Sequence, residues 1–228
     1  MAATAQHPTG YLPPEAAAGF DLSPPPAPGS PEALAERRAW EAAAAGADVR
    51  DWRQAALDDA AFTAPSPALL FACALGRQTD AARAPITTAL LRRTLVDVEA
   101  AAAPLKRRFA RPRPYEGDDA ARLCITVPPE RRRGTATAYP SSSAALGVVW
   151  AEALSLLAPE RADALRRRGE RLGDLRLVCR VHYASDVTAG RTLGHMVTDQ
   201  LRANAAFQAD AARARAELAA LPPAACAD

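Results

Sequence analysis

The sequence predicts an all-α protein, built as a compact bundle of many helices. Hydrophobic residues make up 49% of the 228 residues but aromatic residues only 5%, and alanine dominates the apolar set. Alanine favours closely packed helices, whereas a β-sandwich draws on Val, Ile and Tyr for its strands. Apolar side chains also recur at helical spacing, most clearly at Ile86, Leu90, Leu91, Leu95 and Val98.

Residues 1–30 are typical of an extended arm, because "YLPPE" and "LSPPPAPGSPE" are rich in proline, glycine and serine. Ser30-Pro31-Glu32 then predicts a helix start: serine caps, proline suits the first turn and glutamate favours the positive helix end. That helix should run over 31–46. The expected organisation is an arm at 1–30, a single helical domain at 31–220 and a tail at 221–228.

Further helices are expected on both sides of a long loop at 110–140, whose prolines and charges break the helical pattern. A loop of that length in a compact domain is usually functional or mobile. Pro104 is expected to start a new turn or to kink its helix. The predicted helices span 51–61, 66–76, 79–83, 85–109, 141–158, 159–171, 173–184, 185–203 and 204–220.

Composition and charge exclude several classes of partner. The formal net charge is only +2, so no global field draws the chain to nucleic acid or to an anionic membrane. No stretch approaches the roughly 18 apolar residues of a membrane span, and "MAATAQHPTG" lacks the apolar core of a secretion signal. We expect a periplasmic or secreted protein if a signal peptide has been removed, and a cytoplasmic one otherwise.

The cysteines predict no metal site. Cys73, Cys124, Cys179 and Cys226 form no C-x-x-C pair of the kind that zinc sites use. One or two disulfides remain open if the compartment is oxidising.

A basic run, "LKRRFARPRPYE" at 105–116, is the first candidate for chemistry. Such runs are most often a solvated surface. Pro112 and Pro114, however, fix the backbone around Arg113 and reduce the entropy lost on aiming its guanidinium. A rigid guanidinium suits a compact anion, because its planar fork meets phosphate oxygens two at a time.

A second candidate lies in "DLRLVCRVHYASDVTAGR" at 174–191, where Arg176 and His182 interrupt an apolar stretch expected to be helical. Asp186 follows His182 by four residues, so its carboxylate could fix the histidine tautomer and support positive charge on the ring. Ser185 looks like the cap of the next helix.

A third candidate is "AYPSSSAALG" at 138–147, which places three serines before an apolar helix. One of them, Ser141, suffices as an N-cap. Ser142 and Ser143 are either tolerated first-turn residues or donors that face an anion.

Taken in order, these segments resemble the signature of the acid phosphatase and haloperoxidase superfamily, also called the PAP2 family. That signature is K-x6-R-P, then P-S-G-H, then S-R-x5-H-x3-D. In detail the chain is similar to the bacterial class A non-specific acid phosphatases, from about residue 11 to 203. Beyond the three motifs, this similarity includes "YLPPE", "GSPEALAERRAWEA", Cys124, "APERADAL" and "VHYASDVTAGR".

The resemblance implies the PAP2 helical fold and a role for each matched residue. Phosphate would be clamped by basic side chains, with Ser141 and the backbone N–H of Ser142 as neutral donors at a helix start. His182 would be the nucleophile that forms a phosphohistidine, oriented by Asp186. No metal or other cofactor is implied, and phosphate or vanadate would bind as an anion. The clamp residues are Lys106, Arg113 and Arg176.

The chain also departs from the signature, because its P-S-G-H motif is Pro140-Ser141-Ser142-Ser143. The family's glycine and general-acid histidine are therefore Ser142 and Ser143, and Leu175 replaces the serine before Arg176. A serine hydroxyl is far too weak an acid to protonate an alkoxide, a step worth typically about 10² to 10⁴ in rate. We therefore expect metal-independent phosphoryl transfer or hydrolysis that favours good leaving groups.

No obvious substitute acid is present. The other histidines are His7, in the arm, and His195, more than three helical turns beyond His182. Glu116, Asp118 and Asp119 could supply an acid, but exposed loop carboxylates are the plainer interpretation.

Two other functions stay open: an enzyme repurposed for acyl transfer or a biosynthetic rearrangement, and a phosphate-binding protein without turnover. A vanadium haloperoxidase is disfavoured because the acid-base histidine is missing. The expected partner is a small anionic substrate, with no nucleic acid or membrane, and a homo-oligomer such as a dimer remains open. We expect the loop at 114–139 to set specificity.

Overall fold

A computed structural model describes residues 8–46, 48–62 and 66–226. Within these ranges the chain is helical and contains no strand, apart from an isolated bridge between Arg77 and Pro223, so the all-α class is confirmed. The α-helices are α1 (Pro14–Ala18), α2 (Pro31–Gly46), α3 (Val49–Ala61), α4 (Ala72–Leu75), α5 (Pro85–Phe109), α6 (Ser142–Leu157), α7 (Ala162–Val178), α8 (Ala184–Ala203) and α9 (Ala205–Ala219). Short 3₁₀ turns are η1 (Pro67–Phe71), η2 (Pro129–Arg131) and η3 (Pro159–Arg161).

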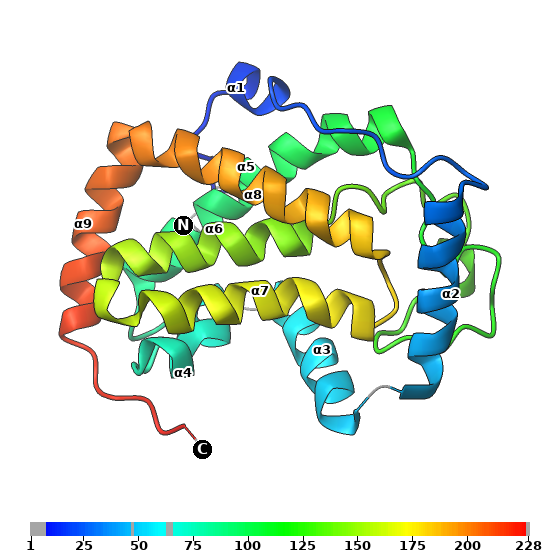
Figure 1. The fold of residues 1–228 in the computed structure, drawn as a ribbon. Helices are drawn as coiled ribbons and strands as arrows, with labels where there is room; N and C mark the ends of the chain where they lie inside the picture. Colours follow the sequence, from blue (N-terminus) through cyan, green and yellow to red (C-terminus); the bar gives the residue numbers. More distant parts are fainter. Residues whose placement is uncertain (1–7, 47, 63–65, 227–228) are drawn as a thin grey trace, which may run out of the picture.

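Helix α6 is the centre of the fold, and α7 and α8 run beside it (Figure 1). Nearly every side chain of α6 is buried, including Trp150 and Leu154. A helix that is apolar on all sides can only be an interior helix. Helices α5 and α9 also pack on α6 and close the core.

Glycines let the backbones of α6, α7 and α8 approach closely. A Cβ on Gly169 of α7 would lie 2.3 Å from the carbonyl oxygen of Gly147 on α6, and the reverse distance is also 2.3 Å. A Cβ on Gly190 of α8 would lie 2.3 Å from the carbonyl oxygen of Ser141. Any side chain at these crossings would push the helices apart, and so displace the helix ends that carry the site.

The arm and the tail both pack on the helices. Tyr11 and Leu22 belong to the buried core, and the backbone N–H of Tyr11 donates to the buried carboxylate of Asp97 at 2.8 Å. After α9, a disulfide joins Cys226 to Cys73 of α4. His7 lies outside the described residues.

Several predicted helix starts are confirmed by their caps. Ser30 Oγ accepts the N–H of Ala33 at the start of α2, and Ser141 Oγ accepts the N–H of Ala144 in the first turn of α6. Helix α5 spans the predicted 85–109 and continues through Pro104, so no new helix starts at that proline. Its last turn carries Lys106.

Two predictions before α5 are wrong. Residues 66–76 form the 3₁₀ turn η1 followed by the short α4, instead of one helix. Residues 79–83 are not helical: the Asp80 side chain accepts the N–H groups of Ala82 and Arg83, and this local turn competes with a helix.

The predicted break near residue 172 is also wrong, because α7 runs unbroken to Val178. Gly173 lies inside that helix and makes room for α8, since a Cβ there would lie 3.1 Å from Val187 Cγ1. The chain leaves the helix at 179–183, where Arg180 has φ 64°. His182 therefore lies in a connecting loop and not in a helix, and the residue that precedes α8 as its cap is Tyr183, not Ser185.

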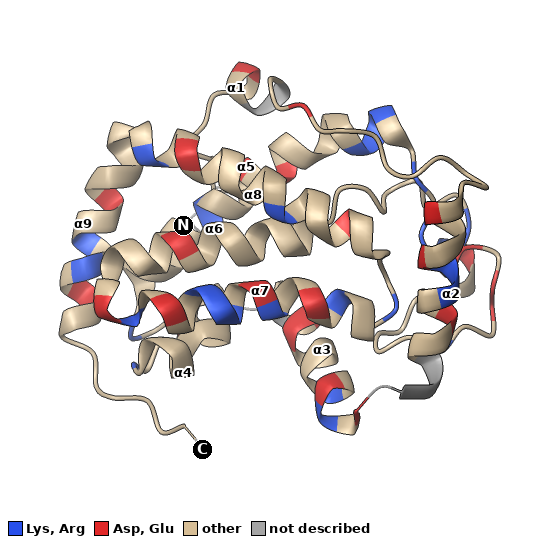
Figure 2. Ribbon diagram, viewed as in Figure 1, with Lys and Arg blue, Asp and Glu red and all other residues tan. Residues whose placement is uncertain are grey.

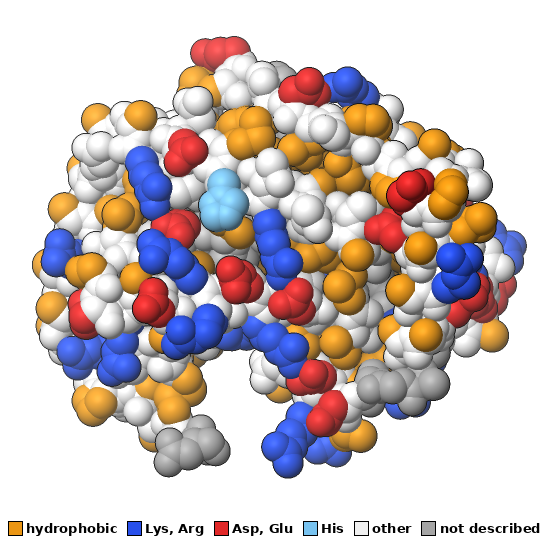
Figure 3. All heavy atoms as spheres, viewed as in Figure 1, with side chains coloured by type: hydrophobic (Ala, Val, Ile, Leu, Met, Phe, Trp, Pro, Cys, Tyr) orange, Lys and Arg blue, Asp and Glu red, His pale blue; other side chains and the backbone are white. Residues whose placement is uncertain are grey.

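Charged residues of both signs cover the outer helices. Figure 2 shows basic and acidic residues interleaved along α2, α3 and α7, while most of α6 is tan. On the face drawn in Figure 3, blue and red side chains are likewise intermixed. In the described part of the chain, no helix is both long and apolar enough to cross a membrane.

The crossing of α6 and α7 gives the first testable prediction. Gly169→Ala should lower the free energy of unfolding by about 1–3 kcal/mol, because the added methyl overlaps the backbone of α6. Urea denaturation measures this change. Gly19→Ala is the control: its Cβ would meet nothing closer than 3.6 Å, so its effect should stay below about 0.5 kcal/mol. Equal stability of the two variants would contradict this account of the packing.

Candidate active site

One end of the core gathers the predicted site residues from segments far apart in sequence. The last turn of α5, the first turn of α6, the last turn of α7 and the loop 179–183 meet there beneath the 110–140 loop (Figure 1). They enclose a cavity of about 910 Å³. Of the predicted residues, those that line it are Lys106, Arg113, Ser142, Ser143, Arg176 and His182.

His182 is buried, with 3% of its surface exposed, and both ring nitrogens have partners. Nη1 of Arg113 lies 2.8 Å from Nε2, and Asp186 Oδ2 lies 3.3 Å from Nδ1. A guanidinium can only donate, so Nε2 must accept from Arg113. We therefore assign the ring proton to Nδ1, facing Asp186, and the lone pair to Nε2.

The surroundings of His182 keep the ring neutral. Burial and the nearby charge of Arg113 together lower the pKa of His182 to about 3, and they outweigh the opposing effect of Asp186. At mildly acidic pH the Nε2 lone pair is consequently not lost to a proton.

Asp186 is fully buried and is fixed from several sides. Its Oδ2 accepts the backbone N–H of Tyr183 at 2.8 Å, and its Oδ1 pairs with Arg111. Burial raises the pKa of Asp186, but the hydrogen bond with His182 and the charge of Arg111 outweigh that effect and leave it below its usual range. The carboxylate is therefore ionised beside the imidazole.

Side chains of helix α2 contact the chain on both sides of His182. Glu36 accepts from the backbone N–H of Ser185 at 2.6 Å and from Arg111 at 2.8 Å. One turn later, Trp40 Nε1 donates to the carbonyl of Arg180 at 2.8 Å, and the Arg180 guanidinium stacks 3.9 Å over the Trp40 ring. These contacts hold the histidine without using either ring nitrogen.

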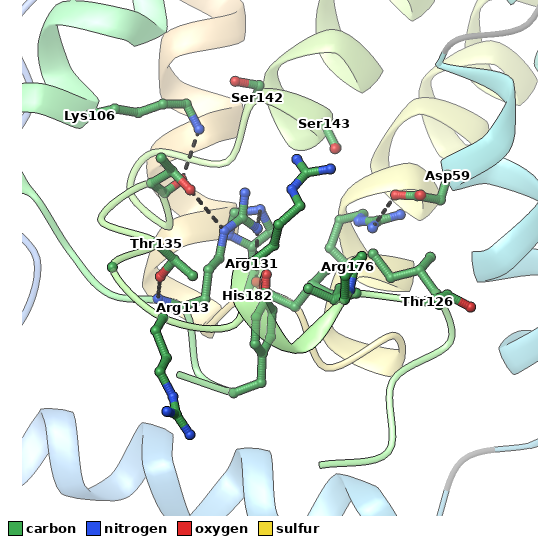
Figure 4. A pocket seen from close by; sticks show the side chains of 18 of the residues that line it. Asp59, Lys106, Arg113, Thr126, Arg131, Thr135, Ser142, Ser143, Arg176 and His182 are labelled. Carbon is green, nitrogen blue, oxygen red and sulfur yellow. Dashed lines mark hydrogen bonds and ion pairs between the residues drawn. The ribbon is translucent and has the colours of Figure 1, made fainter. Parts of the chain in front are cut away.

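Arg113 and Lys106 both line the cavity and approach the loop segment at 135–137 from different elements (Figure 4). Arg113 Nη1 also donates to the carbonyl of Val181 at 2.9 Å, and Lys106 Nζ donates to the carbonyl of Thr137 at 3.0 Å. Burial lowers the pKa of Lys106 to about 8, with a further contribution from the charge of Arg113. Both groups are positively charged below that pH.

Arg176, in the last turn of α7, has hydrogen-bond donors without a partner among the described residues. Its guanidinium is 3% exposed, and Nη2 pairs with Asp59 Oδ1 of α3 at 2.6 Å. Its Nε and Nη1 are buried and have no hydrogen-bond partner among the described residues. Burial lowers the pKa of Arg176, but a guanidinium stays charged in proteins.

The start of α6 separates the three serines. Ser141 is fully buried as the cap and does not line the cavity, so donation from Ser141 to an anion stays a prediction. Ser142 and Ser143 line the cavity, and Ser142 Oγ is buried without a hydrogen-bond partner in the described part of the chain. Ser142 and Arg176 thus both contribute buried donors without a described partner to the residues that line the cavity with His182.

Among the described residues, the alternative acids considered from the sequence do not line the cavity. His195 is exposed on α8 and does not line the cavity. Glu116 accepts from the N–H groups of Gly134 and Thr135, and bonding to Thr135 lowers its pKa, so it braces the loop as an ionised carboxylate. Asp118 and Asp119 are also absent from the cavity wall.

Curated relatives share most of this chain. A non-specific acid phosphatase of Salmonella typhimurium is 33% identical over 205 residues, which cover 87% of this chain and 79% of that protein. A non-specific acid phosphatase of Providencia stuartii is 31% identical over 201 residues, covering 88% and 80%, and an acid phosphatase of Zymomonas mobilis is 31% identical over 199 residues, covering 86% and 74%. The chain belongs to the non-specific acid phosphatase family. No protein-family model matches it.

In this member of the acid phosphatase family, the loop is tied to the site covalently. All four cysteines are paired, and the second disulfide joins Cys124 to Cys179 at the end of α7. The disulfide therefore fixes the 110–140 loop next to the segment that carries His182. In the described residues, no cluster of His, Cys, Asp or Glu is arranged to hold a metal ion.

Sequence reasoning missed several residues of this acid phosphatase site. Arg111 was visible in the basic run, and the Arg-Pro-Arg-Pro repeat hints at two aimed guanidiniums, but nothing local assigns Arg111 to Asp186. Asp59, Glu36 and Arg131 approach the site only through the tertiary fold.

The lowered pKa of Lys106 gives a prediction for anion binding. The affinity for inorganic phosphate should fall as pH rises above about 8, because Lys106 then loses its charge. Calorimetric titration from about pH 6 to about pH 10 measures this decline, and comparison with variants removes the ionisation of phosphate itself. Lys106→Met should bind phosphate weakly, and its affinity should show no fall attributable to residue 106. Lys106→Arg should bind phosphate without the fall in affinity above about pH 8. A wild-type curve parallel to that of Lys106→Met would contradict the assignment.

Proposed function

We propose that this protein is an acid phosphatase that transfers phosphoryl groups through a phosphohistidine at His182. The observation that carries the proposal is the state of that side chain: a neutral ring with Nδ1 against Asp186 and Nε2 facing a cavity lined by Lys106, Arg113 and Arg176. Relatives named acid phosphatases, sharing most of the chain, support the general activity.

Substrate binding comes first. The phosphoryl oxygens accept from the free Nε and Nη1 of Arg176, from Ser142 Oγ and from Lys106. They also take over the N–H group of Arg113 that Nε2 accepts in the free protein. Binding therefore releases the Nε2 lone pair at the moment when phosphorus lies next to it.

Transfer then follows in two steps. Nε2 attacks phosphorus, the P–O bond to the leaving group breaks, and that oxygen departs with the bonding electron pair. Asp186 stabilises the positive charge that develops on the ring, and the clamp cations stabilise the charge on the transferring oxygens. A water oxygen, or another acceptor hydroxyl, next attacks phosphorus, and the P–N electrons return to Nε2.

The missing proton donor sets the choice of substrate. Ser143 lines the cavity where the resemblance places the general-acid histidine, and its hydroxyl cannot protonate a departing alkoxide. Aryl phosphates and anhydrides depart as stabilised anions, so they suffer less from the loss than alkyl esters.

No metal ion takes part in the proposed reaction, because basic side chains supply the electrostatic stabilisation. We further propose that the protein works in an oxidising compartment such as the periplasm. Its two disulfides support this localisation, since disulfides persist outside reducing cytosol.

Replacing the nucleophile tests the mechanism. His182→Ala should lower kcat for p-nitrophenyl phosphate by at least about 10³-fold, because the covalent route is lost. His195→Ala is the matched control, because His195 is exposed outside the cavity and should leave kcat unchanged. Rapid-quench mass spectrometry should detect one phosphoryl group on the wild type and none on His182→Ala. Activity that survives His182→Ala would overturn the phosphohistidine mechanism and favour a repurposed enzyme.

Restoring a proton donor tests the role of Ser143. Ser143→His should raise kcat/KM for an alkyl phosphate by about 10-fold or more relative to p-nitrophenyl phosphate, because only the alkoxide needs the proton. Ser143→Asn controls for side-chain size and supplies no acid. If both variants change the two substrates by the same factor, the leaving-group argument fails.

A further inference from the structure

Two cations that line the cavity lie outside the phosphate clamp, Arg131 and Arg133, and of these Arg133 is paired with Asp119. Arg131 ends the 3₁₀ turn η2 in the middle of the 110–140 loop and lines the same cavity as His182. Figure 4 shows its side chain extending into the cavity toward Ser143. Its guanidinium makes no ion pair or hydrogen bond with any other described side chain or carbonyl.

The arginines that follow Arg131 are used differently. Arg132 anchors the loop, donating to the carbonyls of Val127, Asp118 and Ala121. Arg133 pairs with Asp119 at 2.8 Å. The anchoring by Arg132 holds η2 over the cavity, so the base of the Arg131 side chain is fixed while its charge remains available.

The size and charge of the cavity leave room for a second anionic group. Its volume of about 910 Å³ lies within the range of about 300–1,000 Å³ that encloses whole small molecules, well beyond a single phosphoryl group. Carboxylates also line it, but Asp59 is paired with Arg176, and Glu99 and Glu130 form no ion pair with Arg131. The position next to Ser143 therefore carries an unneutralised positive charge.

We propose that Arg131 binds the leaving group of a phosphoric anhydride, so that the substrates of this enzyme are pyrophosphate and diphosphate esters cleaved at the terminal phosphoryl group. This inference rests on the proposed phosphohistidine reaction. A guanidinium cannot give up a proton, but it stabilises a leaving group that departs as an anion. A departing phosphate carries that negative charge and offers oxygens for a bidentate contact, whereas a neutral alcohol offers neither.

Pyrophosphate is cleaved in two steps. Nε2 of His182 forms a P–N bond to one phosphorus, and the bond from that phosphorus to the bridging oxygen breaks. The bridging oxygen leaves with both electrons on the second phosphate, whose added charge faces Arg131 and which takes a proton from solvent on release. A water oxygen then attacks the phosphohistidine, the P–N electrons return to Nε2, and a proton passes to solvent. The products are two phosphate ions.

The test compares two substrates on three proteins. Wild type, Arg131→Gln and Arg133→Gln are assayed with pyrophosphate and with p-nitrophenyl phosphate, and the ratio of the two kcat/KM values is taken. Arg131→Gln should lower that ratio, pyrophosphate over aryl ester, by roughly 10-fold or more, as expected for the loss of a charged hydrogen bond. Arg133→Gln removes the same charge from the same loop and from the lining of the same cavity, but its guanidinium is paired with Asp119 and that of Arg131 is not, so its ratio should stay within about 2-fold of wild type.

The outcomes separate this inference from the proposed function. A ratio that is unchanged in Arg131→Gln, or equally lowered in Arg133→Gln, overturns the leaving-group site even if His182→Ala is inactive on both substrates. If the proposed phosphohistidine mechanism is wrong, His182→Ala should instead remain active. Arg131→Lys provides a further check, because a point charge without the planar fork should recover only part of the ratio.

Discussion

The carboxylate of Asp186 is the contact on which the site and its surrounding fold both depend. It accepts the backbone N–H of Tyr183 at the start of α8, faces Nδ1 of His182 and pairs with Arg111. The backbone carbonyl of the same residue accepts the N–H of Ser141, which caps α6. One buried residue thus connects the beginnings of two core helices to His182. Burial of this charge is tolerated because it is paired and hydrogen-bonded on several sides.

The fold holds that connection rigid through backbone packing. Gly147 and Gly169 let α6 and α7 touch, and Gly190 lets α8 meet the cap of α6. Because Arg176 lies in the last turn of α7, Ser142 begins α6 and Asp186 lies in the first turn of α8, the relative positions of the three helices fix the geometry of the candidate site. Helix α2 also stabilises the segment around His182, through hydrogen bonds of Glu36 and Trp40. The helix ends therefore hold most of the candidate site residues, and the long loop supplies further side chains around them.

With that loop in place, the cavity offers several positive charges but no strong proton donor. Ser143 provides no useful acid, and the other candidate carboxylates brace the loop or pair with arginines. Cations from several elements line the cavity: Lys106 from α5, Arg113, Arg131 and Arg133 from the loop and Arg176 from α7. An arrangement of this kind favours anions, because the cavity offers several guanidinium and ammonium donors and Ser143 offers no strong acid.

The sequence by itself determined the all-α class, most helix positions and six of the residues that line the cavity, because alanine-rich apolar periodicity, caps and motif spacing are local signals. It also placed Ser141 correctly as the cap of α6. It failed where long-range contacts override local ones: α7 continues through Gly173 because that glycine packs against α8, and His182 leaves the helix because α2 and a disulfide hold the loop at 179–183. Only the tertiary structure assigned Arg111 to Asp186, Asp59 to Arg176 and Arg131 to the cavity. Each of these contacts joins residues far apart in the chain, and neither residue alone carries a pattern that names its partner.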